Sequence, residues 1–289
     1  MPAPRGAVRE ALDIAVTAVR GVFRAHLTDV AASLAYYAFL AIPATLLVAV
    51  GAFGLFAGET TIQSLLDRLD GVVPEDALTL IDDSLTRVTS SSQSGLGLAA
   101  VGLVIALWTS VGAMTALMRG LNRVHGCEET RSFPRQRLTA LVLLAWSLVA
   151  VILSFGLLVL GAPLSEALGE AVGAESAVRW LWWALEWPIL VTGLLAAVTA
   201  ILRAGPACAR HRLGAELTGA GVAVVIWLVA SGGFAIYAAR FGHYGAAWGS
   251  LSAVIVMLTW LWLTSLAILI GARVEVEIEE RGGAVASRS

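Results

Sequence analysis

Six long apolar runs dominate the pattern of hydrophobic and polar positions along this chain. They cover about residues 31–57, 96–117, 138–160, 182–202, 217–239 and 248–272. An α-helix needs about 20 mainly apolar residues to cross about 30 Å of hydrocarbon, and each run is long enough. None of them alternates apolar and polar residues as a membrane strand does. The pattern predicts an all-α integral membrane protein, a bundle of six transmembrane helices.

The segments around these runs have other patterns. Residues 7–27 repeat apolar side chains at helical spacing with charged residues off that stripe, which predicts an amphipathic interfacial helix within the N-terminal segment 1–29. Residues 58–95 are acidic and carry apolar residues typical of two short helices broken at a proline. We expect this segment to form a small external cap on the membrane domain, residues 30–273. Residues 274–289 are expected to be an exposed tail.

The composition supports the membrane class. Hydrophobic residues make up 58% of the 289 positions and charged residues 14%, whereas soluble globular chains average about 45–50% and about 25%. The mean hydropathy is +0.82. These values exclude a soluble globular protein. The two cysteines are too few for a disulfide framework.

All nineteen basic residues are arginines, and their distribution predicts the orientation of the chain. Fifteen of them lie in the N-terminal segment, in the loops after the second and fourth runs, and near the C-terminus. Because cytoplasmic loops carry an excess of positive charge, both termini are expected in the cytoplasm. The other four arginines lie on the opposite side: Arg68, Arg87, Arg179 and Arg240.

A tryptophan-rich stretch, RWLWWALEWPIL at residues 179–190, places a carboxylate beside the fourth run. Glu186 precedes Arg203 by seventeen residues, or about 26 Å of helix, which puts it near the outer edge of the hydrocarbon layer. We expect the helix to continue through Pro188 with a kink. Glu186 is then a boundary carboxylate, with a role at an outer vestibule as the alternative. The surrounding indoles are expected to form an aromatic belt: Trp180, Trp182, Trp183 and Trp187.

Four blocks in order along the chain resemble the YihY/BrkB family of bacterial inner-membrane proteins. AASLAYYAFLAIP (31–43) is similar to an alanine-rich AYY…P signature, and LWTSVGAMTALMRGLNRVHG (107–126) to a W…aL…aLN pattern. WP at 187–188, followed by LRAGP at 202–206, is similar to a third block. WGSLSAVIVMLTWLWLTSLAILIGA (248–272) resembles the most distinctive stretch, a YGSLGA…W…GAE pattern.

The resemblance implies a multi-pass protein of six helices in the bacterial inner (cytoplasmic) membrane, without assigning an activity. The chain departs from the family pattern at three positions: Arg273 replaces an acid, Glu275 an asparagine and Ala41 a serine. The family has also carried a ribonuclease label. The residues argue against a nuclease, because metal-dependent nucleases need clustered acidic or histidine ligands, and the four histidines are scattered.

Two loops of the chain each carry one histidine and one cysteine. His125 and Cys127 lie in one arginine-rich loop, and Cys208 and His211 in another, so together they match a Cys₂His₂ zinc set. The spacing is unusual, however, and nothing in the sequence brings the two loops together. We expect no metal, no cofactor, no catalytic residues and no enzymatic activity. We also expect no nucleic acid partner, since orientation alone explains the arginines of RSFPRQR (131–137).

Polar residues within the runs, two proline-interrupted helices and the lack of a catalytic set favour a transporter-like protein that moves a lipid, another amphiphile or an ion. The alternative is a scaffold for envelope proteins, docking through residues 58–95. Membrane lipids are the expected partners, and the sequence does not decide whether the chain forms a homo-oligomer. The pair Gly219 and Ala223, and the pair Gly232 and Gly233, are expected to be close-packing positions.

Three arginines and one asparagine, Arg119, Asn122, Arg203 and Arg273, are expected at the cytoplasmic ends of the second, fourth and sixth runs. They either extend to the interface as isolated side chains or form a cluster that closes an inner gate or holds an anionic headgroup. The complete set of candidate functional residues is Tyr36, Tyr37, Pro43, Trp108, Arg119, Asn122, Glu186, Pro188, Arg203, Pro206, Tyr237, Gly249, Trp260 and Arg273.

Overall fold

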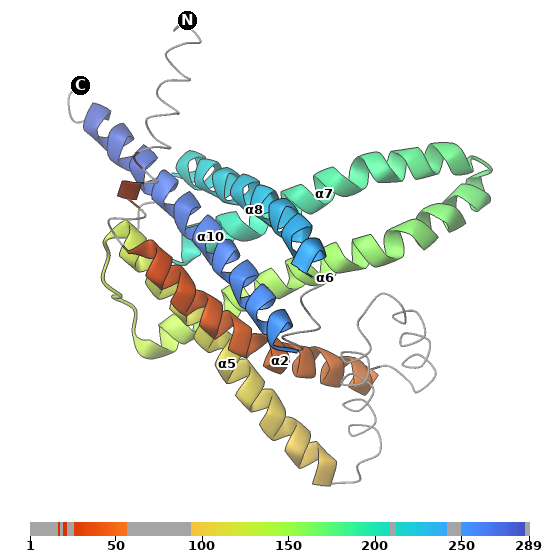
Figure 1. The fold of residues 1–289 in the computed structure, drawn as a ribbon, viewed down its shortest axis with the longest axis horizontal. Coiled ribbons are helices and arrows are strands. Elements are labelled where there is room, and N and C mark those ends of the chain that lie inside the picture. The colour runs from red at the N-terminus through yellow and green to blue at the C-terminus, as the bar shows by residue number, and fades with distance from the viewer. Residues whose placement is uncertain are drawn as a thin grey trace, which may run out of the picture. The chain divides into compact units, whose positions relative to one another are not determined.

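A computed structural model of the chain describes residues 17, 20, 21, 26–56, 94–208, 212–241 and 250–286. All secondary structure in these ranges is helical (Figure 1). The helices are α2 (Leu27–Phe56), α5 (Ser94–His125), α6 (Phe133–Val172), α7 (Glu175–Ala204), α8 (Leu213–Phe241) and α10 (Ser250–Ala286).

Five of these helices contain a segment long and apolar enough to cross a membrane. The segments are Leu103–His125, Phe133–Ser154, Ser176–Ala204, Leu213–Tyr237 and Ala253–Gly282. Helix α2 contributes a shorter apolar stretch, Leu27–Pro43, among the residues that are described. The predicted all-α membrane class is therefore confirmed, while the count of six spans stays a prediction.

Several predicted features lie outside the described residues. Only residues 17, 20, 21, 26 and 27 of the predicted amphipathic helix are described. The predicted external cap is outside them except for residues 94 and 95, which begin α5. Gly249 and His211 also lie outside.

The chain divides into two compact units, with the boundary inside α2 and α5. The smaller unit is Tyr36–Ala113, and the larger comprises Met1–Ala35 and Met114–Ser289. In the smaller unit, α2 continues through Pro43 without interruption. Tyr36 and Tyr37 make an edge-to-face pair with ring centroids 6.0 Å apart, and both side chains are largely exposed.

In the larger unit, α6 and α7 form a long antiparallel hairpin (Figure 1). The turn is set by Gly173, whose φ of 68° lies in the left-handed region that favours glycine. Its N–H donates to Glu170 O at 3.3 Å, and the next N–H, of Ala174, donates to Gly169 O at 3.1 Å. These two bonds satisfy carbonyls that a helix end leaves unpaired.

Helix α7 passes through Pro188 without a break, as the sequence predicts. Trp180, Trp183 and Trp187 are exposed on it, which suits side chains that face lipid or the headgroup layer. Glu186 is half-buried. A Cβ built on Gly161 of α6 would lie 3.6 Å from Glu186 Oε1, so this carboxylate faces the neighbouring helix.

Small residues allow α8 and α10 to approach closely. A Cβ on Gly271 of α10 would lie 2.5 Å from Gly219 O and 2.7 Å from Ala223 Cβ, so the packing role predicted for Gly219 and Ala223 is confirmed. The same prediction for Gly232 and Gly233 is wrong among the described residues, since a Cβ on either meets nothing within 4 Å.

Two tryptophans add polar bonds across the same helix pair. Trp227 Nε1 of α8 donates to Thr264 Oγ1 at 3.1 Å, and Trp260 Nε1 of α10 donates to Ser231 Oγ at 3.3 Å. The two indoles also pack edge to face, with centroids 6.2 Å apart. Hydrogen bonds between helices of this kind stabilise packing where lipid supplies no hydrophobic driving force.

Candidate functional site

The end of α5 is fixed by the short sequence that follows Asn122. Gly126 adopts a φ of 65°, and its N–H donates to Arg123 O at 3.3 Å. The N–H of Cys127 donates to Asn122 O at 2.9 Å. This glycine-centred helix end holds Cys127 directly beside the last turn of α5.

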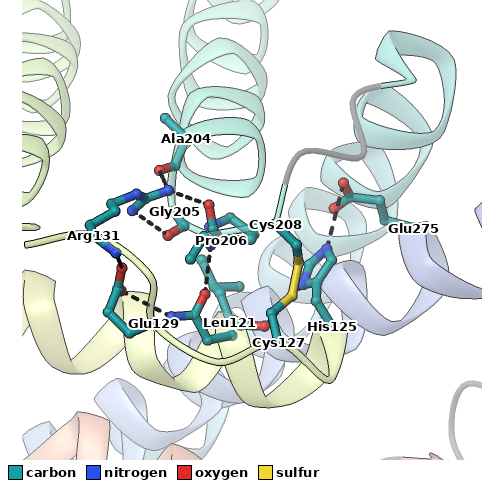
Figure 2. Close-up of a disulfide and its surroundings, with 12 residues drawn as sticks. Leu121, His125, Cys127, Glu129, Arg131, Ala204, Gly205, Pro206, Cys208 and Glu275 are labelled. Carbon is teal, nitrogen blue, oxygen red and sulfur yellow. Dashed lines mark hydrogen bonds and ion pairs between the residues drawn. A yellow bond between two sulfur atoms is a disulfide. The ribbon is translucent and has the colours of Figure 1, made fainter.

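Cys127 forms a disulfide with Cys208, across 81 residues of sequence, with Cα atoms 6.0 Å apart (Figure 2). The bond joins the loop between α5 and α6 to the segment that follows α7. No feature of the sequence brings these two loops together, but in the structure they meet. We call the residues involved, 122–131 and 204–208, the loop junction.

Arg131 ties the junction to the C-terminal end of α7. Its guanidinium donates to Gly205 O and to Ala204 O, each at 3.1 Å, and also to Pro206 O (Figure 2). The last carbonyls of a helix have no partner within the helix and carry partial negative charge. A cation with several donors in one plane is well suited to satisfy them.

Asn122 and Glu129 complete the junction from the other side. Asn122 Oδ1 accepts from the N–H of Ala207 at 2.7 Å, and Asn122 Nδ2 donates to Glu129 Oε2 at 3.0 Å. Glu129 also accepts from the N–H of Arg131 at 3.1 Å and from Gln136 Nε2 at 3.2 Å. The two halves of the junction are therefore joined by a polar network as well as by the disulfide.

His125 links the junction to α10. Its Nδ1 lies 2.9 Å from Leu121 O; because a carbonyl only accepts, Nδ1 carries the proton of this bond. The other ring nitrogen, Nε2, lies 3.8 Å from Glu275 Oε1, and both side chains are almost completely buried. Glu275 is thus placed against a titratable ring.

A second buried carboxylate joins α7 to α8. Glu216 is 0% exposed and its Oε2 lies 3.3 Å from Arg203 Nη1. It sits in the first turn of α8, where the N-terminal end of the helix dipole also stabilises a negative charge. Burial of an unpaired carboxylate is very unfavourable, so the contact with Arg203 stabilises the charge of Glu216 in this arrangement of the helix ends.

Arg273 has an acidic partner one turn further along its own helix, since its Nη2 lies 3.8 Å from Glu277 Oε2. Arg281 Nε donates to Glu277 Oε1 at 3.0 Å. Arg281 therefore lies on the continuing helix α10 with a partner, and not on an exposed tail.

The chain matches the family described as Virulence factor BrkB over residues 18–288. It belongs to the BrkB family.

Relatives of this BrkB-family chain carry two kinds of name. YfkH of Bacillus subtilis, named as a ribonuclease-like protein, is 28% identical over 76% of this chain and 78% of its own length. A UPF0761 membrane protein of Ralstonia nicotianae is 29% identical over 89% of the chain, which covers 56% of that relative. One from Verminephrobacter eiseniae is 27% identical over 93% of the chain and 63% of its own length. No solved structure matches significantly.

The candidate residues of the BrkB-family chain are not all gathered in one place. Asn122 and Pro206 meet at the junction, Arg203 lies at the adjoining end of α7, and Arg273 lies on α10. Arg119 is exposed on α5. Others lie along the helices: Tyr36, Tyr37, Pro43 and Trp108 in the smaller unit, and Glu186, Pro188, Tyr237 and Trp260 in the larger one.

Sequence reasoning missed Cys127, Cys208, Glu129, Arg131 and Glu216 as members of this site. One signal was available for the cysteines, because each follows a predicted span in a loop predicted to face the same side. Within the described residues, no group of three or more His, Cys, Asp or Glu side chains is placed to hold a metal ion.

Proposed function

We propose that this BrkB-family chain is a transporter-like protein of the bacterial inner membrane that moves a lipid, another amphiphile or an ion, with both termini in the cytoplasm. The observation that carries the proposal is the set of charged contacts between different helices at one end of the larger unit. Arg203–Glu216 joins α7 to α8, and His125–Glu275 joins α5 to α10. We propose that this end is the gate on the cytoplasmic side.

The physical argument rests on how such contacts break and reform. The His125–Glu275 contact is buried, whereas Arg203 is half exposed beside the buried Glu216. Pairs of both kinds contribute little net stability, because water screening or desolvation offsets most of the attraction between the charges. They therefore hold helix ends in one arrangement without making the alternative arrangement prohibitively unfavourable. A change in position at these ends would exchange protein partners for water or for charged groups of a substrate. Alternating access by movement of one group of helices against another needs contacts with this property.

We propose further that the chain is not an enzyme. The ribonuclease-like name belongs to the Bacillus relative. In this chain the four histidines lie in four separate segments of the sequence, whereas metal-dependent hydrolysis needs ligands converging on one ion. Large apolar side chains are exposed along α6 and α7, which supports lipid as the surroundings of these helices.

The proposal is tested by reconstituting the full chain into liposomes and measuring ion flux, release of a trapped fluorophore and scrambling of fluorescent lipids. We expect a rate above that of protein-free liposomes in at least one assay. The variant Arg203→Ala removes the contact between Arg203 and Glu216 and should change that rate. A folded sample that is silent in all three assays, together with reproducible protein crosslinks in cells, would instead support the scaffold.

A further inference from the structure

A cavity of about 510 Å³ lies beside the loop junction, at the ends of α5 and α10. Its walls include Arg20 and Gly21 from the N-terminal segment, Arg123 and His125 from α5, and Arg273 and Glu280 from α10. Its volume is in the range of about 300–1,000 Å³ that is typical of sites for small molecules. Of the four residues in the two proposed gate contacts, His125 lines this cavity, whereas Arg203, Glu216 and Glu275 do not.

The charge of the lining favours an anion. The charged residues that line the cavity are one carboxylate, Glu280, and three arginines, Arg20, Arg123 and Arg273. Glu277 lies 3.8 Å from Arg273 but also bonds Arg281 at 3.0 Å, so its charge is shared between two guanidinium groups. The lining therefore holds three arginines against one carboxylate. Like charges around one cavity repel one another, and an anion bound between them relieves this repulsion.

Arg273 supplies a second, independent observation. Its Nε is buried and has no hydrogen-bond acceptor among the described residues. A Cβ on Gly21 would lie 2.8 Å from this same atom. A larger residue at position 21 would therefore collide with the guanidinium of Arg273. A buried donor without an acceptor is unfavourable, and the Arg273 side chain that carries this donor also lines the cavity.

We propose that this cavity is a binding site for a phosphate group, carried either by a lipid headgroup or by a soluble phosphate ester. Arginine forks match phosphate oxygens in pairs of parallel hydrogen bonds. A phosphate presents several acceptor oxygens in different directions, which suits arginines that come from three separate segments. The site requires no transport step, so it goes beyond the function proposed above and can hold if that proposal fails.

The test measures binding to the full chain in nanodiscs. One arm uses phosphatidylcholine discs and titrates glycerol 3-phosphate by calorimetry. The other arm uses discs that also contain phosphatidic acid or phosphatidylglycerol and counts retained lipids by native mass spectrometry. Saturable binding in the first arm identifies a soluble phosphate ester, and retention in the second arm alone identifies a lipid headgroup.

Three variants make the result specific to the cavity. Arg123→Ala should weaken binding about tenfold or more, since a hydrogen bond between charged groups is lost. Glu280→Gln should tighten it, because the carboxylate that opposes the anion is removed, and a misfolded protein would not give this gain. Arg135→Ala removes the same charge from an exposed position on α6 outside the lining and should leave binding unchanged.

Two results would overturn the site. One is the absence of saturable phosphate binding in both arms. The other is an equal loss of phosphate affinity in Arg123→Ala and Arg135→Ala, with no gain of affinity in Glu280→Gln. That result would mean that binding depends only on the net charge of the protein. Loss of flux in liposomes with binding retained would count against the transporter proposal alone.

Discussion

Asn122 is almost completely buried, and each half of its amide has its own partner. The oxygen accepts from Ala207 N–H at 2.7 Å and the nitrogen donates to Glu129 at 3.0 Å. Glu129 in turn accepts from the backbone N–H of Arg131 at 3.1 Å. A residue that looks like one member of a helical motif in the sequence is therefore the central connection between two loops.

We predict that Asn122→Ala lowers the free energy of unfolding by about 1–3 kcal/mol, because it leaves a buried N–H and a carboxylate short of partners. Thermal or denaturant melting of the detergent-solubilised protein measures this. Thr139→Ala is the matched control, since the Thr139 hydroxyl bonds only within its own helix, to Arg135 O at 2.9 Å. An equal loss of unfolding free energy in the two variants would contradict the role of Asn122.

The sequence indicated which residues mark the helix ends but not what they contact. The family-like blocks led to Asn122, Arg203 and Pro206, and the structure places all three at or beside the junction. Their acidic partners, Glu129 for Asn122 and Glu216 for Arg203, lie outside these family-like blocks. Which loops meet depends on how the helices pack, and hydrophobic periodicity carries no information about that.

At the scale of elements, the approach of α8 to α10 depends on Gly219 and Gly271. Each would place a Cβ about 2.5–2.6 Å from the other's carbonyl oxygen, so any side chain there must push two backbones apart. The spacing of Gly219 and Ala223, four residues apart, predicted this contact from the sequence. Helix ends were harder to predict, because a helix continues beyond its apolar run: α6 extends to Val172 and α10 to Ala286.

We predict that Gly271→Ala destabilises the protein by about 1–3 kcal/mol, the usual effect of overpacking a tight contact. Gly221→Ala is the control on α8, where a Cβ meets nothing within 4 Å. Alanine is a better helix former than glycine, so this control should be neutral or up to about 1 kcal/mol more stable. Opposite shifts in melting temperature would support the close contact, and shifts of the same sign would refute it.

At the scale of the whole molecule, the arginine distribution and the disulfide together predict that the junction is sensitive to redox conditions. The arginines predict that the junction faces the cytoplasm, where thiols are kept reduced. Cys127 and Cys208 are then expected to be thiols in growing cells and to form their bond on oxidation. The bond links the loop after α5 to the segment after α7, so it would restrict movement of these helix ends.

We propose that this end of the molecule must open for a substrate to pass. The most direct measurement compares the transport or scrambling rate of reconstituted protein before and after reduction of the Cys127–Cys208 bond. We predict a slower rate in the oxidised protein, a faster rate on adding reductant, and no response to reductant in the Cys127→Ser/Cys208→Ser variant. A wild-type rate that is the same in both redox states, with the bond confirmed by mass, would contradict the claim.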